Sequence, residues 1–315
     1  MSNLPILLLV VCSPACCAPA PQVEASITSP KMSSGALRLE EDEVGLRVFF
    51  GEELFCAYDR QNELRPILWP VNGPSGAPVT RAFPQEEGVE GESADHPHHQ
   101  SVWYGHGRVN GHDFWHCGHG ERVVDLGELE IDGPGEEGVL ERGFLMSWQV
   151  GGEELCQEER VLRFRGTPDE RWIDFEVTLV ATQTELLFGD TKEGTFAVRL
   201  APTLRLNGKV AQGSIRNSEG ETGKKAWGKR AAWVEYSGPV GGETVYVSLH
   251  DHAENLRHPT WWHARDYGLL AANPFGVHDF EKKPKGTGDF TLARGERLTQ
   301  RYSLRLASTP FASGE

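Results

Sequence analysis

Residues 95–120, DHPHHQSVWYGHGRVNGHDFWHCGHG, contain most of the side chains in this chain that could transfer protons near neutral pH. Imidazole gains and loses a proton in that range, and flat aromatic rings offer apolar faces on which a ring-shaped ligand can lie. This composition predicts a binding or catalytic pocket. The stretch holds seven of the twelve histidines, namely His96, His98, His99, His106, His112, His116 and His119, together with Trp103, Tyr104 and Trp115.

Three later segments also combine polar and aromatic residues. Residues 189–199 place Glu193 and Arg199 after an apolar run, at a strand end where a carboxylate could act as a base. Residues 217–230 have the composition of a loop, with Trp227 and Arg230 available to close over a ligand. In residues 250–275 so many polar groups flank the paired tryptophans that a core position is disfavoured, because buried polar groups need partners. We interpret this segment as a loop that forms a ligand wall.

Three functions fit these residues. A sugar-type pocket with histidine as acid and base is the favoured hypothesis. A metal-dependent enzyme would use two or three histidines as ligands, although the sequence has neither the cysteine pairs of a structural zinc site nor an HExxH motif. A non-catalytic glycan-binding surface protein would need only the aromatic residues. The candidate metal ligands are His96, His98, His99, His106, His116, His250 and His252; no other cofactor is predicted.

Charge and hydropathy restrict the partners. The formal net charge is −15, from 46 acidic and 31 basic residues, which argues against nucleic acid or an anionic membrane because both require a basic surface. No apolar run is long enough to span a bilayer. Residues 1–20 have the composition of a signal or lipoprotein leader and residues 21–35 that of a linker, so we expect export to the periplasm or cell surface.

Alternating patterns predict an all-β fold. Residues 45–50 and 54–58 flank a short turn and predict a hairpin, and residues 172–180 and 296–306 alternate apolar with polar side chains. We expect one large antiparallel β-sandwich over residues 36–308 and a short tail over 309–315. Further strands are predicted at residues 65–69, 123–131, 139–150, 155–164, 231–236 and 244–249, with a long loop over 71–94. Cys56, Cys117 and Cys156 allow at most one disulfide.

Four long motifs resemble a bacterial family of unknown function that is abundant in planctomycetes and often labelled PmoA or methane-oxygenase-like. These motifs are DHPHHQSVWYGHGRVNGHDFWH, GDTKEGTFAVRL, NSEGETGKKAWGKRAAWVEYSG and HPTWWHARDYGLLAANPFG. The resemblance covers roughly residues 35 to 308. A methane-oxidising membrane subunit requires transmembrane helices, for which this chain has no apolar run of sufficient length.

The architecture more remotely resembles the galactose-mutarotase-like supersandwich, with ARGERLTQRYSLRL as a closing strand of the kind common there. In epimerases of that fold a histidine acts as acid and a glutamate from a later strand as base. By role, the resemblance implies His99 or His106 as the acid and Glu193 as the base. The predicted substrate-binding residues for a carbohydrate or glycoside are His98, Trp103, Arg199, Trp227, Arg230, Trp261, Trp262, His263, Arg265 and Asn273.

Overall fold

Two eight-stranded antiparallel sheets form the framework of the computed structural model, whose described residues are Met1, 37–131, 133 and 135–312. The predicted linker and all of the predicted leader except Met1 lie outside these residues. The first sheet has the order β1 (Leu37–Glu41), β2 (Gly45–Phe50), β3 (Glu53–Asp59), β4 (Ile67–Val71), β5 (Val102–Tyr104), β11 (Phe196–Arg199), β16 (Leu269–Asn273) and β15 (Trp261–Trp262).

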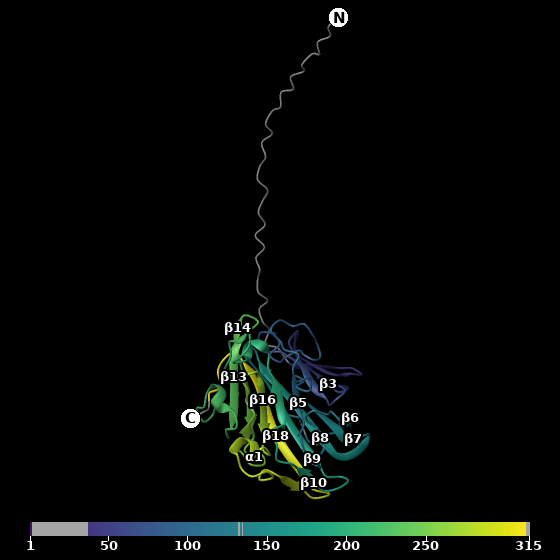
Figure 1. Cartoon of the computed structure of the whole chain (residues 1–315). Coiled ribbons are helices and arrows are strands. Elements are labelled where there is room, and N and C mark those ends of the chain that lie inside the picture. Colours follow the sequence, from purple (N-terminus) through teal and green to yellow (C-terminus); the bar gives the residue numbers. More distant parts are fainter. Residues whose placement is uncertain (2–36, 132, 134, 313–315) are drawn as a thin grey trace. The chain divides into compact units, whose positions relative to one another are not determined.

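The second sheet follows the chain less directly (Figure 1). Its order is β12 (Ser214–Asn217), β13 (Trp233–Val240), β14 (Glu243–Asp251), β18 (Arg297–Ala307), β9 (Glu170–Val180), β8 (Glu153–Thr167), β7 (Leu140–Val150) and β6 (Glu121–Leu129). A separate pair joins β10 (Leu186–Phe188) to β17 (Phe290–Leu292). The described helices are short, namely α1 (Val277–Glu281) and 3-10 turns at Pro202–Leu204 and Gly223–Ala226. None of them could cross a membrane.

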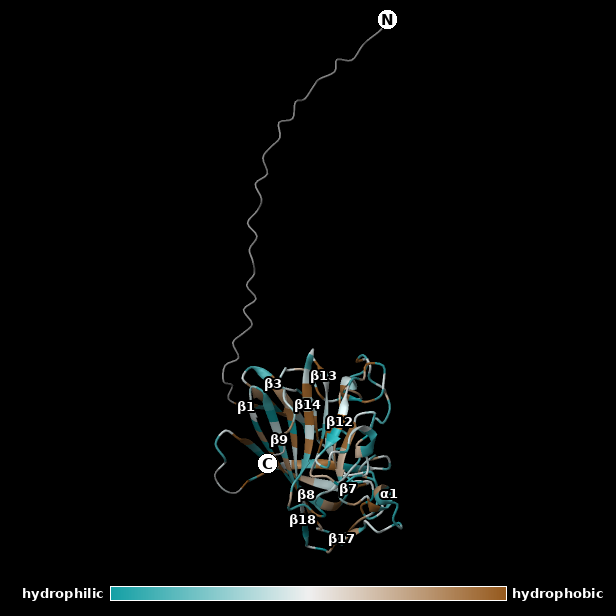
Figure 2. Ribbon diagram, turned by 90° about the vertical axis from the view of Figure 1, so that its left-hand side faces the viewer, coloured by the Kyte–Doolittle hydropathy of each residue, from teal (hydrophilic) through white to brown (hydrophobic). Residues whose placement is uncertain are grey.

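Aromatic side chains join the two sheets into a sandwich. The Phe196 ring of β11 lies 4.5 Å from Phe175 of β9 and 5.3 Å from Tyr302 of β18, measured between centroids. Ile173, Phe175 and other alternate residues of β9 are buried, while the residues between them are partly exposed; Figure 2 colours these strands by hydropathy. The all-β antiparallel sandwich is therefore confirmed, as are the predicted hairpin and the strands predicted at 172–180 and 296–306.

One prediction differs from the structure in detail. The segment predicted as a loop contains two paired strands, β15 and β16, and the side chains of Trp261 and Trp262 point to opposite faces of the sheet. Residues 263–268 connect the two strands. Cys56, Cys117 and Cys156 are all free thiols, so the described residues contain no disulfide. Burial raises the pKa of the Cys117 thiol.

Candidate functional site

The floor of the candidate site is a row of side chains that crosses four strands of the first sheet. Trp103 pairs with Ala197, and Ala197 pairs with Ala271. His263 continues the row, since its backbone N–H donates to the Ala271 carbonyl at 2.8 Å. The residues on either side of this row, such as Val198, belong to the main core, so the row lies on the opposite face. The two alanines in the middle are fully buried in a small apolar cluster with Trp103 and Trp115.

A second row lies two residues further along the same strands. Arg199 of β11 pairs with Leu269 of β16, and the backbone N–H of Arg265 donates to the Leu269 carbonyl at 2.8 Å. Because side chains alternate with a period of two, Arg199 and Arg265 lie on the same face as Trp103 and His263. Strand register thus brings together four residues that are up to 162 positions apart in sequence.

Above this floor the His-rich segment contributes a stack of rings. The His99 ring lies on Trp103 with centroids 5.3 Å apart and planes inclined by 19°. His96 stacks on His99 at 4.8 Å and 6°, and Tyr267 stacks on His96 at 5.5 Å and 8°. Trp115 closes one side of the stack through edge contact with His99 at 5.6 Å. These contacts fix the orientation of the imidazoles.

Together these elements enclose a cavity of about 310 Å³, which we call the histidine cavity. Its volume is at the lower end of the range for small-molecule sites, about 300 to 1,000 Å³. Of the residues predicted to form the site, it brings together His98, His99, Glu193, His263 and Arg265. The complete lining is His96, His98, His99, His116, Lys192, Glu193, His263, Arg265 and Tyr267.

Glu193 reaches the cavity on a loop between β10 and β11 that is held by hydrogen bonds at several points. The buried Asp190 carboxylate accepts from the backbone N–H groups of His278 at 2.9 Å and Gly288 at 2.8 Å. The Asn273 side chain donates to the Thr191 carbonyl at 2.8 Å. Such anchoring holds the loop that carries Glu193 in a fixed position. The Glu193 side chain itself is 22% exposed and pairs with Lys192.

Two buried histidines at the cavity present different hydrogen-bonding atoms. Arg199 lies with Nη1 3.2 Å from Nδ1 of His99, and since arginine only donates, the hydrogen of a neutral His99 must be on Nε2. Nδ1 of His263 lies 3.1 Å from the Lys192 carbonyl oxygen, which only accepts, so this ring keeps its hydrogen on Nδ1. His99 therefore presents a donor and His263 an acceptor.

Burial keeps these imidazoles neutral. It lowers the pKa of His98 to about 3 and that of His263 to about 3. Burial also holds the pKa of His99 far below its ordinary value, and the neighbouring charges of His98 and Arg199 act in the same direction. At neutral pH these three side chains serve as hydrogen-bonding groups without net charge.

His116 has the opposite character and forms a dyad with Asp113. Its Nδ1 lies 2.7 Å from Oδ2 of Asp113, and the hydrogen bond to this carboxylate raises the pKa of His116 above its ordinary value. Glu193 contributes in the same direction, which places it near His116. From the sequence, His116 was predicted only as a possible metal ligand, and no role was predicted for Asp113. The spacing of three residues between Asp113 and His116 in DFWH could have indicated their hydrogen bond.

Asp95 connects the His-rich segment to the sheet beneath it. Its Oδ1 accepts from Nη1 of Arg81 at 2.9 Å and from Nη2 of Arg199 at 3.0 Å, and its Oδ2 lies 2.8 Å from Nδ1 of His96. Burial opposes ionisation of Asp95, but hydrogen bonds from Ser93 and His96 and the Arg199 charge outweigh it and lower the pKa to about 2.

We expect Asp95→Asn to lower the free energy of unfolding by about 1–3 kcal/mol, because two buried guanidinium groups lose their charged acceptor. Chemical denaturation at pH 7 measures this. Since the pKa is lowered on folding to about 2, the contribution is complete above the unfolded pKa of about 4 and is lost as pH falls toward 2. Asp169→Asn in an exposed turn is the control. Equal stability of both variants would contradict the role of Asp95.

Several predicted site residues do not line the cavity, among them Trp103 and Arg199, which are fully buried next to it. His106 is enclosed beside Phe188 and Phe275, with Nε2 donating to the Gly189 carbonyl at 2.8 Å. Trp262 points into the main core. The amide of Asn273 is occupied by Thr191, Phe275 and Gly276. The remaining three, Trp227, Arg230 and Trp261, lie near the same end of the sheet: Arg230 covers the Trp261 ring at 4.7 Å, and Trp227 faces Phe280.

The candidate metal ligands separate into three places, one of which is the enclosed position of His106 beside Phe188 and Phe275. His96, His98, His99 and His116 line the histidine cavity, whereas His250 and His252 line a hollow of the second sheet. Within residues 37–131, 133 and 135–312, no group of three or more His, Cys, Asp or Glu side chains is arranged to hold a metal ion.

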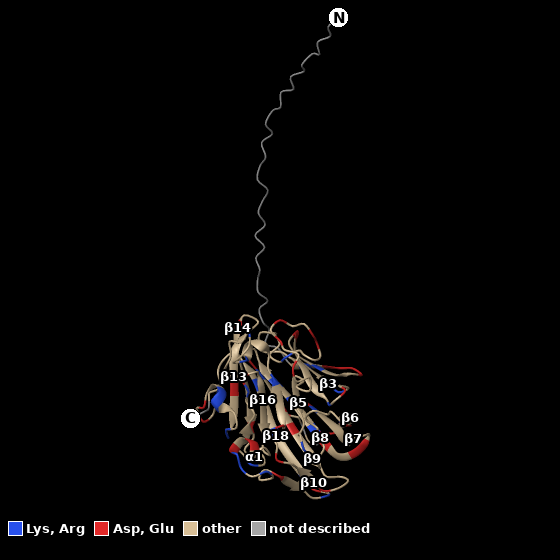
Figure 3. Ribbon diagram, in the orientation of Figure 1, with Lys and Arg blue, Asp and Glu red and all other residues tan. Residues whose placement is uncertain are grey.

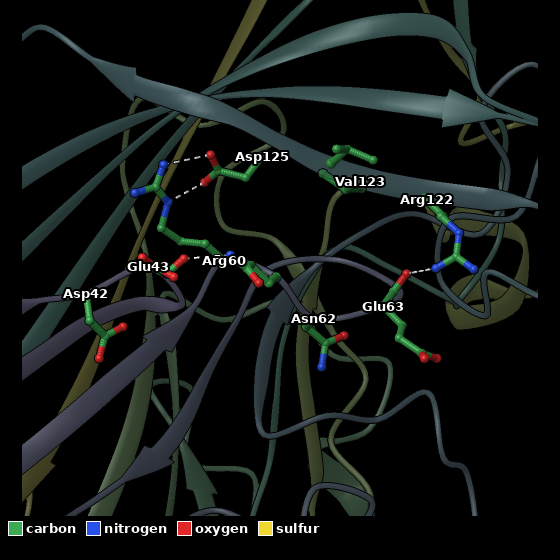
Figure 4. Close-up of a pocket in the computed structure, with 10 residues that line it drawn as sticks. Asp42, Glu43, Arg60, Asn62, Glu63, Arg122, Val123 and Asp125 are labelled. Atoms are coloured by element: carbon green, nitrogen blue, oxygen red, sulfur yellow. Dashed lines mark hydrogen bonds and ion pairs between the residues drawn. The ribbon is translucent and has the colours of Figure 1, made fainter.

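A larger hollow, of about 460 Å³, is lined by the β1–β2 and β3–β4 connections of the first sheet and by β6 of the second. Both of its arginines are engaged: Arg60 donates twice to Asp125 at 2.9 Å, and Arg122 donates to the Glu63 carbonyl (Figure 4). We therefore consider the histidine cavity, with its mixture of acids, bases and cations, the better candidate for a functional site.

Comparisons with known proteins place the chain in a family. No curated protein matches it. Two of the similar solved structures are galactose mutarotase-like proteins. The protein from Lactobacillus casei ATCC 334 has 10% sequence identity and a TM-score of 0.35, and the match covers 86% of this chain and 99% of that protein's chain. The protein from Clostridium acetobutylicum has 9% sequence identity and a TM-score of 0.38, and the match covers 87% of this chain and 99% of that protein's chain. Over residues 46–315 the chain matches, and belongs to, the family of unknown function DUF6807.

Proposed function

We propose that this chain is a carbohydrate-active enzyme that performs acid–base chemistry on a sugar or glycoside in the histidine cavity. One observation carries the proposal. Glu193 and His116 line the same cavity as the neutral imidazoles of His99 and His263, and Asp113 is hydrogen-bonded to His116 from outside the lining. A carboxylate and an imidazole whose pKa values are separated by their surroundings are the usual pair for proton transfer.

The mixture of donors and acceptors favours a hydroxylated ligand. Each sugar hydroxyl both donates and accepts, and the cavity offers His99 as a donor and His263 as an acceptor. The partly exposed ring of Tyr267, at one end of the stack, adds an aromatic surface of the kind on which a pyranose can lie.

In this proposal Glu193 is the base and His116 the acid. The carboxylate takes a proton from the substrate or from a water molecule, while protonated His116 donates through Nε2, since its Nδ1 is engaged by Asp113. The mutarotase resemblance implied His99 or His106 as the acid. In this proposal His99 instead donates a hydrogen bond that stabilises negative charge developing on a substrate oxygen.

A substrate screen tests the proposal. The purified protein would be incubated with reducing sugars, glycosides and glycan mixtures, and products followed by NMR and mass spectrometry. We expect a product with at least one substrate, and we expect His116→Gln to reduce its formation about 100-fold or more. The exposed His119→Gln variant is the control. Glycan binding without any product would support a binding protein instead and contradict the proposal.

The pH dependence of turnover gives a second prediction. Because Asp113 raises the pKa of His116, an acid that must be protonated should lose activity as pH rises through this raised pKa. We expect Asp113→Asn to move the alkaline limb of kcat to lower pH, since the charged acceptor that raises the pKa of His116 is lost. A pH–rate profile of both proteins measures the shift. An unchanged alkaline limb would exclude His116 as the acid.

A further inference from the structure

The charges around the histidine cavity are paired with one exception. Lys192 pairs with Glu193, Arg199 pairs with Asp95, and Lys224 pairs with Asp266 at 2.8 Å. Arg265 lines the cavity but has no ion-pair partner among the described residues. Its sequence neighbour Asp266 is engaged by Lys224, whose hydrogen bond is the main cause of the lowered pKa of Asp266. The Arg265 guanidinium lies over the Tyr267 ring, 5.4 Å from its centroid, so an aromatic face rather than a carboxylate within 4 Å is its neighbour.

The surrounding histidines do not alter this balance. With pKa values of about 3, His98 and His263 are uncharged at neutral pH, so Arg265 is the unpaired fixed cation at the cavity wall. The chain as a whole has a formal charge of −15, and its acidic residues are spread over both sheets (Figure 3). A cation left unpaired at a cavity of an acidic protein points to a ligand that carries a negative charge.

Arg265 also borders a second hollow. This hollow, of about 290 Å³, is lined by Lys224, Trp227, Ala264, Arg265 and Asp266. Trp227 is partly exposed there, and its ring lies 6.4 Å from His263 of the histidine cavity. Because one guanidinium forms part of both walls, a ligand longer than one ring could extend from the histidine cavity past Arg265 to the Trp227 indole.

We propose that the substrate is an acidic carbohydrate, in which a carboxylate, sulfate or phosphate substituent binds the Arg265 guanidinium and an adjoining unit lies against Trp227. The planar guanidinium can form two parallel hydrogen bonds to such a group, which gives both charge and direction. The inference rests on the proposed function for its carbohydrate part. It adds the substrate class and assigns Arg265 the recognition of the acidic group.

Calorimetric titration with matched probes tests this inference. The acidic probes are the methyl glycosides of glucuronate and galacturonate, the 6-sulfates and 6-phosphates of glucose and galactose, and oligosaccharides rich in uronate. The neutral methyl glucoside and galactoside, and inorganic sulfate and phosphate, serve as references. We expect at least one acidic probe to bind about 10-fold or more tightly than its neutral counterpart and than the free anion, with affinity that weakens as salt increases.

Variants assign the effect to Arg265. We expect Arg265→Gln to remove the preference for the acidic probe, and Arg265→Lys to retain part of it, because lysine keeps the charge but loses the planar geometry. Lys225→Gln removes a nearby exposed positive charge outside both hollows and should leave the preference intact. Trp227→Ala should weaken the oligosaccharides more than the single-ring probes.

The outcomes separate this inference from the proposed function. Binding of an acidic probe through Arg265 with no product from any substrate would support the inference and contradict the enzyme. Turnover of neutral substrates that Arg265→Gln leaves unchanged would support the enzyme and overturn the inference. Free sulfate or phosphate binding as tightly as the sugar acids, or no preference for any acidic probe, would also overturn it.

Discussion

Replacing Glu193 with glutamine should reduce turnover by a factor of about 10² to 10⁴, the usual contribution of a general base. Glutamine keeps the size of the side chain but cannot accept a proton, so substrate binding should change much less than kcat. The loop should keep its position, because Asp190 and Asn273 rather than Glu193 anchor it. Steady-state kinetics on the substrate found by screening measures both parameters.

Stability provides the control for this variant. The Lys192–Glu193 pair is partly exposed, and such pairs contribute about 0 to 1 kcal/mol, so thermal unfolding should change little. Glu130→Gln makes the same change at an exposed residue outside the site and should retain full activity. A Glu193→Gln protein that is folded and fully active would remove Glu193 from the mechanism.

The largest effect on folding is expected at Glu158. The Arg160 and Glu158 side chains are both fully buried and form an ion pair. Trp148 donates from Nε1 to Glu158 at 2.7 Å, and the same indole packs on Phe114 of the His-rich segment at 4.7 Å. Glu158→Leu would leave an uncompensated guanidinium in the core, which costs about 3–5 kcal/mol of unfolding free energy. Chemical denaturation measures it.

The double variant Glu158→Leu/Arg160→Met distinguishes charge from packing. Removing both partners leaves no buried charge, so the double variant should be more stable than Glu158→Leu alone, and near the parent if the apolar side chains fill the volume. If the double variant were as unstable as Glu158→Leu, lost packing rather than an unpaired charge would explain the effect.

The architecture could be predicted from the sequence because long, half-buried strands alternate visibly. Residues 172–180 show one buried and one partly exposed face in β9, as their pattern indicates. Strands buried on both faces show no such alternation. All four residues of β11 and all five of β16 are buried, and neither strand was predicted, although both carry the floor of the site.

Residue chemistry indicated which segments form the site but not which atoms reach it. Trp261, Trp262 and His263 are consecutive in sequence, yet only His263 lines the histidine cavity. Trp262 points into the core, and Trp261 lies on the outer face with Val277 and Phe280. The difference is set by strand register, which depends on the pairing of β15 with β16 and has no local signature.

His106 shows the complementary problem. His106 lies in the same His-rich segment as His99. It follows β5, however, and its ring lies against the Gly194 backbone, beside Phe188 and Phe275. A histidine count cannot distinguish an enclosed ring from one that borders a cavity, since that depends on distant residues. The His116–Asp113 dyad, by contrast, is local and could have been found from its spacing.

The most direct test is a crystal structure of the Glu193→Gln protein soaked with the uronate glycosides and their neutral counterparts. The predicted result is a sugar ring in the histidine cavity, within hydrogen-bond distance of His99 and His263, with an acidic substituent on Arg265. A ligand bound in the hollow beside Arg60 and Asp125 instead, with the histidine cavity empty, would contradict the central claim.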